Sequence, residues 1–114
     1  VMPRRIEQLN ELLQREIGTI IARDVEFPKG TMVTILSVRT SGDLKNTRLT
    51  VSIFPDNKRG DILRILRKQS RHIEMLLQEH IPIHHIPSLT WSVDVTEQKA
   101  QEIETLLDSL LPKE

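Results

Sequence analysis

The 114-residue sequence contains no cysteine, which excludes a disulfide scaffold, a cysteine-ligated zinc site and a thiol nucleophile. Aromatic residues are scarce, with two Phe, one Trp and no Tyr, so the core must be aliphatic. The four glycines are isolated from one another, which excludes a glycine-rich phosphate-binding loop. No apolar run approaches the roughly 18 residues that a membrane-spanning helix needs. These absences argue against several classes of enzyme and against membrane insertion.

The remaining composition is that of a single folded domain. Hydrophobic residues make up 38% of the chain and charged residues 28%. Lys and Arg together equal Asp and Glu, 16 of each, so the average charge predicts no partner. The first segment is amphipathic and rich in charge, so we expect no signal peptide. We expect Met2 to be the native start and Val1 to be an added residue.

The spacing of apolar residues predicts helices and strands in a definite order. The predicted elements are a helix over 4–23, strands over about 31–40 and 46–54, a helical segment over 60–80, a strand over 88–95 and a helix over 97–111. Each strand alternates apolar and polar residues and so has one face to bury. We therefore predict a two-layer α+β sandwich with all helices on one face of the sheet. Leu49, Val51, Leu89 and Trp91 should lie in its core.

The helical segment 60–80 contains an interruption in its apolar pattern. No apolar residue occurs from Arg67 to His72, and the pattern resumes at Ile73. One long helix with a polar middle and two helices joined by a kink both fit this pattern. The hydroxyl of Ser70 can bond to the preceding turn, which favours a kink between Lys68 and His72.

Charge is segregated along the chain even though its sum is zero. Six basic residues occur within the fourteen positions 58–71, against Asp61 alone, whereas acidic residues predominate after position 94. The six basic residues are Lys58, Arg59, Arg64, Arg67, Lys68 and Arg71. The last four are spaced at 0, 3, 4 and 7, which places them in one stripe opposite the apolar face of the helix. Such a stripe can follow a phosphate backbone, although a solvated helix face has the same pattern.

Other candidate residues have simpler structural interpretations. His80, His84 and His85 are close in sequence, but no carboxylate or cysteine stands at a familiar metal-ligand offset, so we expect exposed histidines and no metal. Asp43 follows Gly42 and is typical of a turn, while a carboxylate at a binding edge is the alternative. Trp91 is expected in the core, with a surface platform for a nucleic-acid base as the alternative.

No arrangement of residues indicates catalysis. The sequence has no HExxH motif and no Ser/His/Asp set at a strand-to-helix turn. We therefore expect a binding module that is not an enzyme and needs no cofactor.

Several short motifs, taken in order, resemble one known family. They are the first helix, VTILSV at 33–38, Ser-Gly-Asp-Leu at 41–44, Val-Ser-Ile at 51–53, the long helix 62–80, Ile-Pro-Ser-Leu-Thr-Trp at 86–91, and Asp94. In this order and spacing the sequence is similar to bacterial ribosome-binding factor A over nearly its whole length, from Arg4 to about Leu111.

The resemblance implies a single KH-like domain of type II over 1–114, with the order α-β-β-α-kink-α-β and a C-terminal helix. It implies a cytoplasmic, monomeric, non-enzymatic assembly factor that binds the free small (30S) ribosomal subunit. Members of the family assist late maturation of 16S rRNA, including processing of its 5′ end, and matter for growth in the cold. No membrane and no small-molecule substrate are implied.

The sequence departs from the family at two places near the expected RNA site. The family kink has the form Ala-x-Gly, whereas Gln69, Ser70 and Arg71 stand here, and the loop before the last strand carries His84 and His85 in place of arginine. If this loop touches RNA, binding should weaken as the histidines lose their protons.

The predicted RNA-binding residues are Lys58, Arg59, Arg64, Arg67, Lys68, Ser70, Arg71, His84 and His85. Another KH-like RNA-binding module, or a protein–protein adaptor that uses the acidic C-terminal helix, are the alternative functions.

Overall fold

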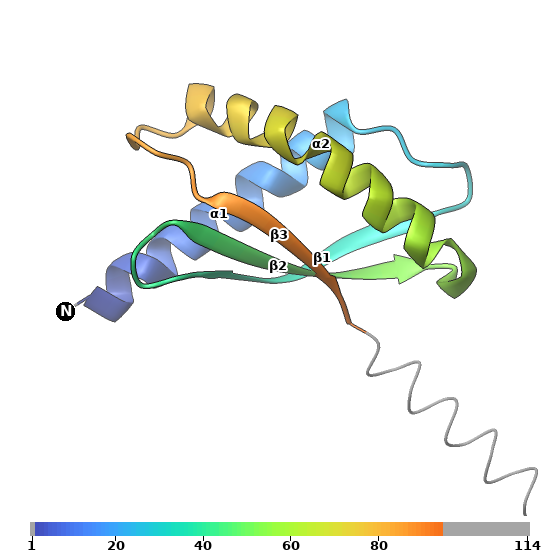
Figure 1. The fold of residues 1–114 in the computed structure, drawn as a ribbon, viewed down its shortest axis with the longest axis horizontal. Helices are drawn as coiled ribbons and strands as arrows, with labels where there is room; N and C mark the ends of the chain where they lie inside the picture. Colours follow the sequence, from blue (N-terminus) through green and yellow to red (C-terminus); the bar gives the residue numbers. More distant parts are fainter. Residues whose placement is uncertain (1, 95–114) are drawn as a thin grey trace, which may run out of the picture.

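The structure is a computed structural model that describes residues 2–94, and its elements follow the predicted order (Figure 1). These elements are α1 (Met2–Asp24), β1 (Met32–Thr40), β2 (Asn46–Phe54), the short 3-10 helix η1 (Asp56–Lys58), α2 (Arg59–His80) and β3 (Ser88–Val93). The predicted C-terminal helix over 97–111 and the predicted end of the last strand at Val95 lie outside the described residues. In the described part of the chain, no helix is long and apolar enough to cross a membrane.

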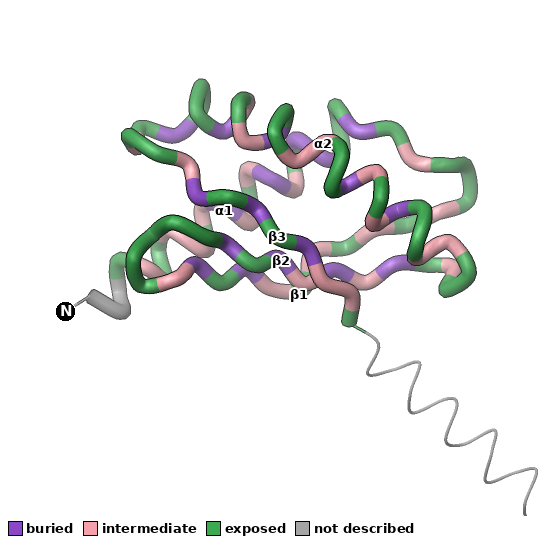
Figure 2. The backbone as a smooth tube through the Cα atoms, in the orientation of Figure 1, coloured by how far each residue is buried: buried purple, intermediate pink, exposed green. Residues whose placement is uncertain are grey.

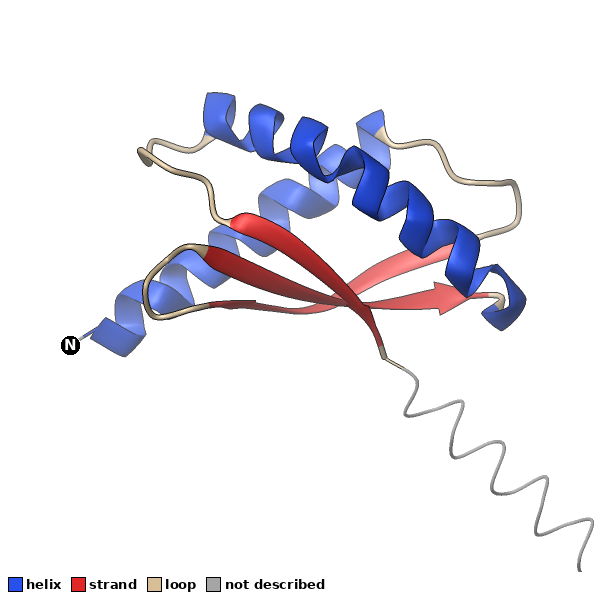
Figure 3. Ribbon diagram, in the orientation of Figure 1, coloured by secondary structure: helices blue, strands red, loops and turns tan. Residues whose placement is uncertain are grey.

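The sheet has the strand order β1-β2-β3. β1 and β2 form an antiparallel hairpin, whereas β3 runs parallel to β2. A parallel pair needs a long crossover connection, and α2 provides it. Both helices cover the same face of the sheet, and the opposite face has no described layer over it (Figure 3). The predicted two-layer α+β architecture is therefore confirmed, with both α1 and α2 on one face of the sheet.

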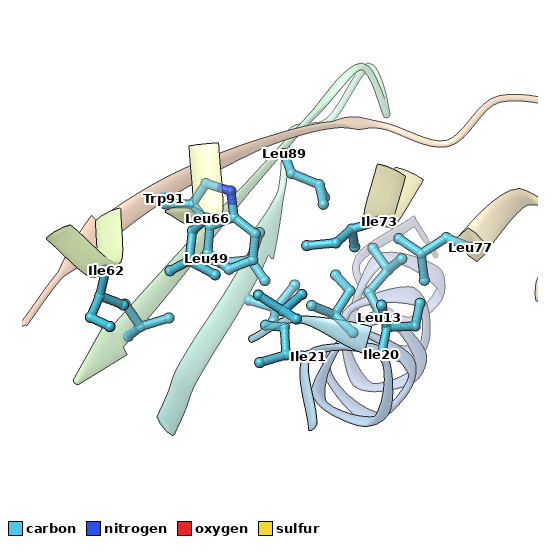
Figure 4. Packing of buried hydrophobic residues seen from close by; sticks show 14 of the residues in the cluster. Leu13, Ile20, Ile21, Leu49, Ile62, Leu66, Ile73, Leu77, Leu89 and Trp91 are labelled. Atoms are coloured by element: carbon cyan, nitrogen blue, oxygen red, sulfur yellow. The ribbon is translucent and has the colours of Figure 1, made fainter. Parts of the chain in front are cut away.

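The core fills the space between the helices and the covered face of the sheet (Figures 2 and 4). Of the four core residues predicted from strand alternation, Leu49 and Val51 are fully buried, and Leu89 and Trp91 are at most 9% exposed. The helices contribute residues at helical spacing, such as Leu13, Ile17 and Ile20. Apart from the ring of Trp91, the buried cluster is aliphatic, as the scarcity of aromatic residues requires.

The predicted break in the second helix is absent, because α2 is a single helix over Arg59–His80. Its buried residues are Ile62, Leu66, Ile73 and Leu77. The seven-residue step from Leu66 to Ile73 is close to two full helical turns, so the apolar face keeps its phase through the polar stretch. The prediction of a break between Lys68 and His72 is therefore wrong, and the alternative of one long helix with a polar middle is the observed one. A bend without a break stays a prediction.

Ser70 occupies the core-facing position of that polar turn. Its hydroxyl donates a hydrogen bond to the Leu66 carbonyl oxygen at 2.8 Å, as the sequence predicted. This bond lies within one helical turn, so it can form in an uninterrupted helix. Gln69 and Arg71 stand where the resemblance described above implies alanine and glycine, and neither residue weakens a helix as glycine does.

Candidate nucleic-acid interface

The outward side of α2 carries the predicted stripe of basic side chains. Arg64, Arg67, Lys68 and Arg71 are all exposed, and we refer to these four residues as the basic stripe. Ile62, Leu66 and Ile73 are buried in the core, where Figure 4 labels them, and the four basic residues on the other side of α2 are exposed to solvent. The packing of the apolar face therefore determines where the charge lies.

Ion pairing neutralises little of this charge. Arg64 lies 3.5 Å from Asp61, and Arg59 lies 3.7 Å from Asp56. Both pairs are partly or largely exposed, and exposed pairs of this kind contribute at most about 1 kcal/mol. Within residues 2–94, Arg67, Lys68 and Arg71 have no carboxylate within ion-pair distance. Like charges three and four residues apart on a helix repel one another, so this surface favours a bound anion.

Lys58 and Arg59 lie where the chain passes from η1 into α2, and both are half-buried. Five residues separate Arg59 from Arg64, which turns Arg59 about 140° around the helix from Arg64 and places it on the side of the buried Leu66. Arg59 also lies 3.7 Å from Asp56. That Lys58 and Arg59 extend the basic stripe therefore stays a prediction.

Ser70 does not belong to this exposed surface. Its oxygen accepts a hydrogen bond from the indole Nε1 of Trp91 at 2.7 Å, while its own proton goes to Leu66. The residue therefore joins α2 to β3, and Figure 4 shows Trp91 beside Leu66 within the core. The prediction that Trp91 lies in the core is confirmed. A buried indole N–H needs a hydrogen-bond acceptor, and this need pointed in the sequence to a polar residue such as Ser70 on the facing helix.

His84 and His85 are exposed in the segment that links α2 to β3. This segment lies at the opposite end of α2 from Lys58 and Arg59 (Figure 1). A 22-residue helix is about 33 Å long, so the histidines and the start of the helix cannot touch one phosphate group together. Over residues 2–94, no cluster of three or more His, Asp or Glu side chains could hold a metal ion.

Asp43 organises the turn of the β1–β2 hairpin. Its carboxylate accepts hydrogen bonds from the Ser41 hydroxyl at 2.6 Å and from the Lys45 backbone N–H at 3.0 Å. These bonds stabilise the charged carboxylate and lower the pKa of Asp43 below its ordinary value, and the bond from Ser41 has the larger effect. Leu44, which follows, adopts a left-handed conformation with φ of 63° and is 48% exposed. The geometry supports the turn-forming interpretation of Asp43.

Arg39 and Arg48 are exposed basic residues that the sequence analysis did not single out. They lie on adjacent strands on the face of the sheet that no described helix covers. The sequence could have indicated this basic pair, because both arginines stand at outward positions of predicted strands and these strands contain no acidic residue.

Comparison with protein families gives one match over most of the chain. The family model described as "Ribosome-binding factor A" matches residues 5–107. A protein of that name from Akkermansia muciniphila is 35% identical, with 98% of this chain and 91% of that protein aligned. A second, from Chlorobium phaeovibrioides, is 33% identical over 96% of this chain and 93% of its own length.

Comparison with solved structures gives the same fold. The solution structure of a Thermotoga maritima protein titled as a ribosome binding factor A has a TM-score of 0.67 at 19% identity, covering 77% of this chain and 85% of that one. A homology model of Thermus thermophilus ribosome binding factor A, fitted into a cryo-EM map of a 30S complex with that protein, has a TM-score of 0.63 at 22% identity. That alignment covers 75% of this chain and 90% of the other.

Proposed function

Because this chain belongs to the ribosome-binding factor A family, we propose that it binds the free small (30S) ribosomal subunit and assists late maturation of 16S rRNA. This role includes processing of the 5′ end and needs no catalytic group on this chain. The family member fitted into a 30S complex supports the first part of the proposal. The details of rRNA maturation rest on the resemblance to the family.

The observation that carries the proposal is the basic stripe on α2. Three of its four cations lack an acidic partner in the described part of the chain, and all four point to solvent from one rigid helix. Arginine side chains bind phosphate groups with two parallel hydrogen bonds, and lysine binds them as a point charge. A rigid row of such groups matches the regular charge of an RNA backbone.

Phosphate contacts of this kind position a protein but do not read sequence. Specificity for the assembling subunit would then come from the shape of the rRNA. Lys58 and Arg59 would add contacts at the N-terminal end of α2, and His84 and His85 would make a separate contact at the far end. The role proposed for Ser70 is indirect, since its hydroxyl holds the helix against β3.

The experiment that tests this proposal is salt-dependent binding to purified 30S and 50S subunits. We expect Arg67→Ala with Arg71→Ala to weaken 30S binding, most strongly at low salt. Each lost phosphate contact removes about 0.7 to 0.9 from the slope of log K against log salt, so the double variant should flatten it by roughly 1.4 to 1.8. The fold should be unchanged, because both side chains are exposed.

The matched control replaces two exposed arginines of α1, Arg15 and Arg23, with alanine. This control removes the same charge from a helix outside the proposed interface, so the slope should stay near that of the unaltered protein. If the α2 variant folds normally and binds 30S with unchanged affinity and slope, the basic stripe is only a solvated helix face. Equal binding to 50S subunits would contradict the proposed target.

A further inference from the structure

The face of the sheet opposite the helices has an unusual composition. Within their bounds the three strands contain two arginines and no acidic residue. The exposed Asp94 follows β3 directly and bonds through its N–H group to the Val51 carbonyl, away from the arginines. Next to the arginines, the outward positions of the strands carry mainly Ser and Thr. The hydroxyls of Thr50 on β2 and Ser92 on β3 are hydrogen-bonded to each other at 3.3 Å. No described layer covers this face (Figure 3).

The strand register places the two arginines side by side. Arg39 of β1 is the direct partner of Arg48 of β2, and Thr90 of β3 is the partner of Arg48 on its other side. The three residues form a row across the sheet and line a shallow hollow together with Ser41 and Asn46. Neither arginine has a carboxylate within ion-pair distance among residues 2–94.

Like charges directly opposite on adjacent strands destabilise a sheet. A bound anion between the two guanidinium groups would remove this repulsion. Two planar groups with several N–H donors each, beside a threonine hydroxyl, are suited to a phosphate group in particular.

The other end of the same face carries an exposed aromatic ring. Phe54 is 68% exposed and is the register partner of Met32, which is 66% exposed. Exposed aromatic rings on an open sheet, combined with positive charge, are a recurrent platform for unpaired bases of single-stranded RNA.

We propose that this face is a second RNA-binding surface, on which Arg39 and Arg48 bind phosphates of a single-stranded segment and Phe54 stacks on one of its bases. The inference rests on the proposed function and deepens it. The basic stripe lies on the helical layer and the arginine pair on the sheet layer, so the protein would bridge two separate segments of rRNA. A bridge of this kind would hold an unfinished RNA region in place without any chemical step.

The charge test uses the full-length protein and purified 30S subunits. Arg39→Gln with Arg48→Gln should weaken binding and flatten the slope of log K against log salt by roughly 1.4 to 1.8. Arg39→Lys with Arg48→Lys keeps the charge and should keep most of the slope. Phe54→Leu should weaken binding by at least about fivefold while the slope stays unchanged, because stacking releases no counterions.

A position test uses the absence of native cysteine. Thr34→Cys on the open sheet face and His72→Cys on α2 each supply one attachment point for an iron chelate that cleaves nearby RNA. Both residues are exposed. We expect both tethered proteins to cleave 16S rRNA, and to do so at different segments.

The outcomes separate this inference from the proposed function. If the sheet variants bind as the unaltered protein does and the Thr34 tether cleaves no rRNA, while the α2 variants still lose binding, only the second surface is overturned. Tighter 30S binding by the Arg39/Arg48→Gln variant would also overturn it, because an acidic protein segment would then be the occupant. If the unaltered protein fails to bind 30S at all, the proposed function fails.

Discussion

At the scale of single residues, the contact between Ser70 and Trp91 connects the two layers. Ser70 donates to the Leu66 carbonyl and accepts from the Trp91 indole, so a polar side chain at a core-facing position is satisfied on both sides. A tryptophan brings an N–H group into the core, and that group must find an acceptor.

We predict that Ser70→Ala lowers the free energy of unfolding by about 1–3 kcal/mol, because it leaves the buried indole N–H without a partner. Trp91→Phe removes the same N–H, so the double variant should lose less than the sum of the two single losses. Urea unfolding of the four proteins measures this coupling.

The matched control is Thr19→Ala in α1. The Thr19 hydroxyl donates to the carbonyl four residues earlier, as Ser70 does, but it is exposed and bonds nothing else. Its replacement should change the stability by no more than about 0.5 kcal/mol. A Ser70→Ala loss equal to that of Thr19→Ala would show that the Trp91 contact contributes nothing.

At the scale of elements, α2 is the part of the fold that determines the proposed site. It is the crossover between two parallel strands, and it carries core residues on one side and the basic stripe on the other. A break in its middle would change the relative direction of its two halves and would divide the stripe. The single helix keeps Arg64 and Arg71 on one rigid rod.

We predict that the backbone amides of residues 67–73 are protected from hydrogen exchange as strongly as those of the turns before and after them. Gln69→Ala with Arg71→Gly, which restores the Ala-x-Gly pattern, should increase exchange in this stretch, because glycine costs about 1 kcal/mol in a helix interior. Gln69→Ala alone is the control and should leave protection unchanged or raised. Rapid exchange at 69–72 in the unaltered protein would contradict the single helix.

At the scale of the whole molecule, one core joins the two layers. α1 and α2 pack on the same face of the sheet, and the buried residues of all five main elements form one cluster. The separate charged surfaces are attached to this common core, so their relative positions depend on it. A molecule with one core should unfold as one unit.

We predict that Leu66→Ala, at a fully buried position of α2, destabilises the protein by about 2–5 kcal/mol. Trp91 is the only tryptophan, so its fluorescence reports the junction of α2 and β3, while circular dichroism reports the helices. The two signals should give the same urea midpoint before and after the substitution. Leu36→Ala, at a 46% exposed position of β1, is the control and should cost less than about 1 kcal/mol.

The sequence alone was sufficient for the features that depend on local periodicity. Alternation placed Leu49, Val51, Leu89 and Trp91 on the buried face, and all four lie there. Helical spacing likewise placed the basic stripe opposite the apolar face of α2. These patterns are reliable because the period of a strand or helix determines which side chains share a face.

Only the tertiary structure decided the features that depend on contacts between distant segments. The apolar spacing left one helix and two helices open for α2, and the structure shows one helix whose Ser70 accepts a hydrogen bond from Trp91, 21 residues away. The Arg39–Arg48 pair follows from the hairpin register, in which the shift between Ile35 and Ser37 leaves Arg39 opposite Arg48. A local pattern contains neither a partner across the sheet nor a register, because both are set by which layers pack together and where the chain turns.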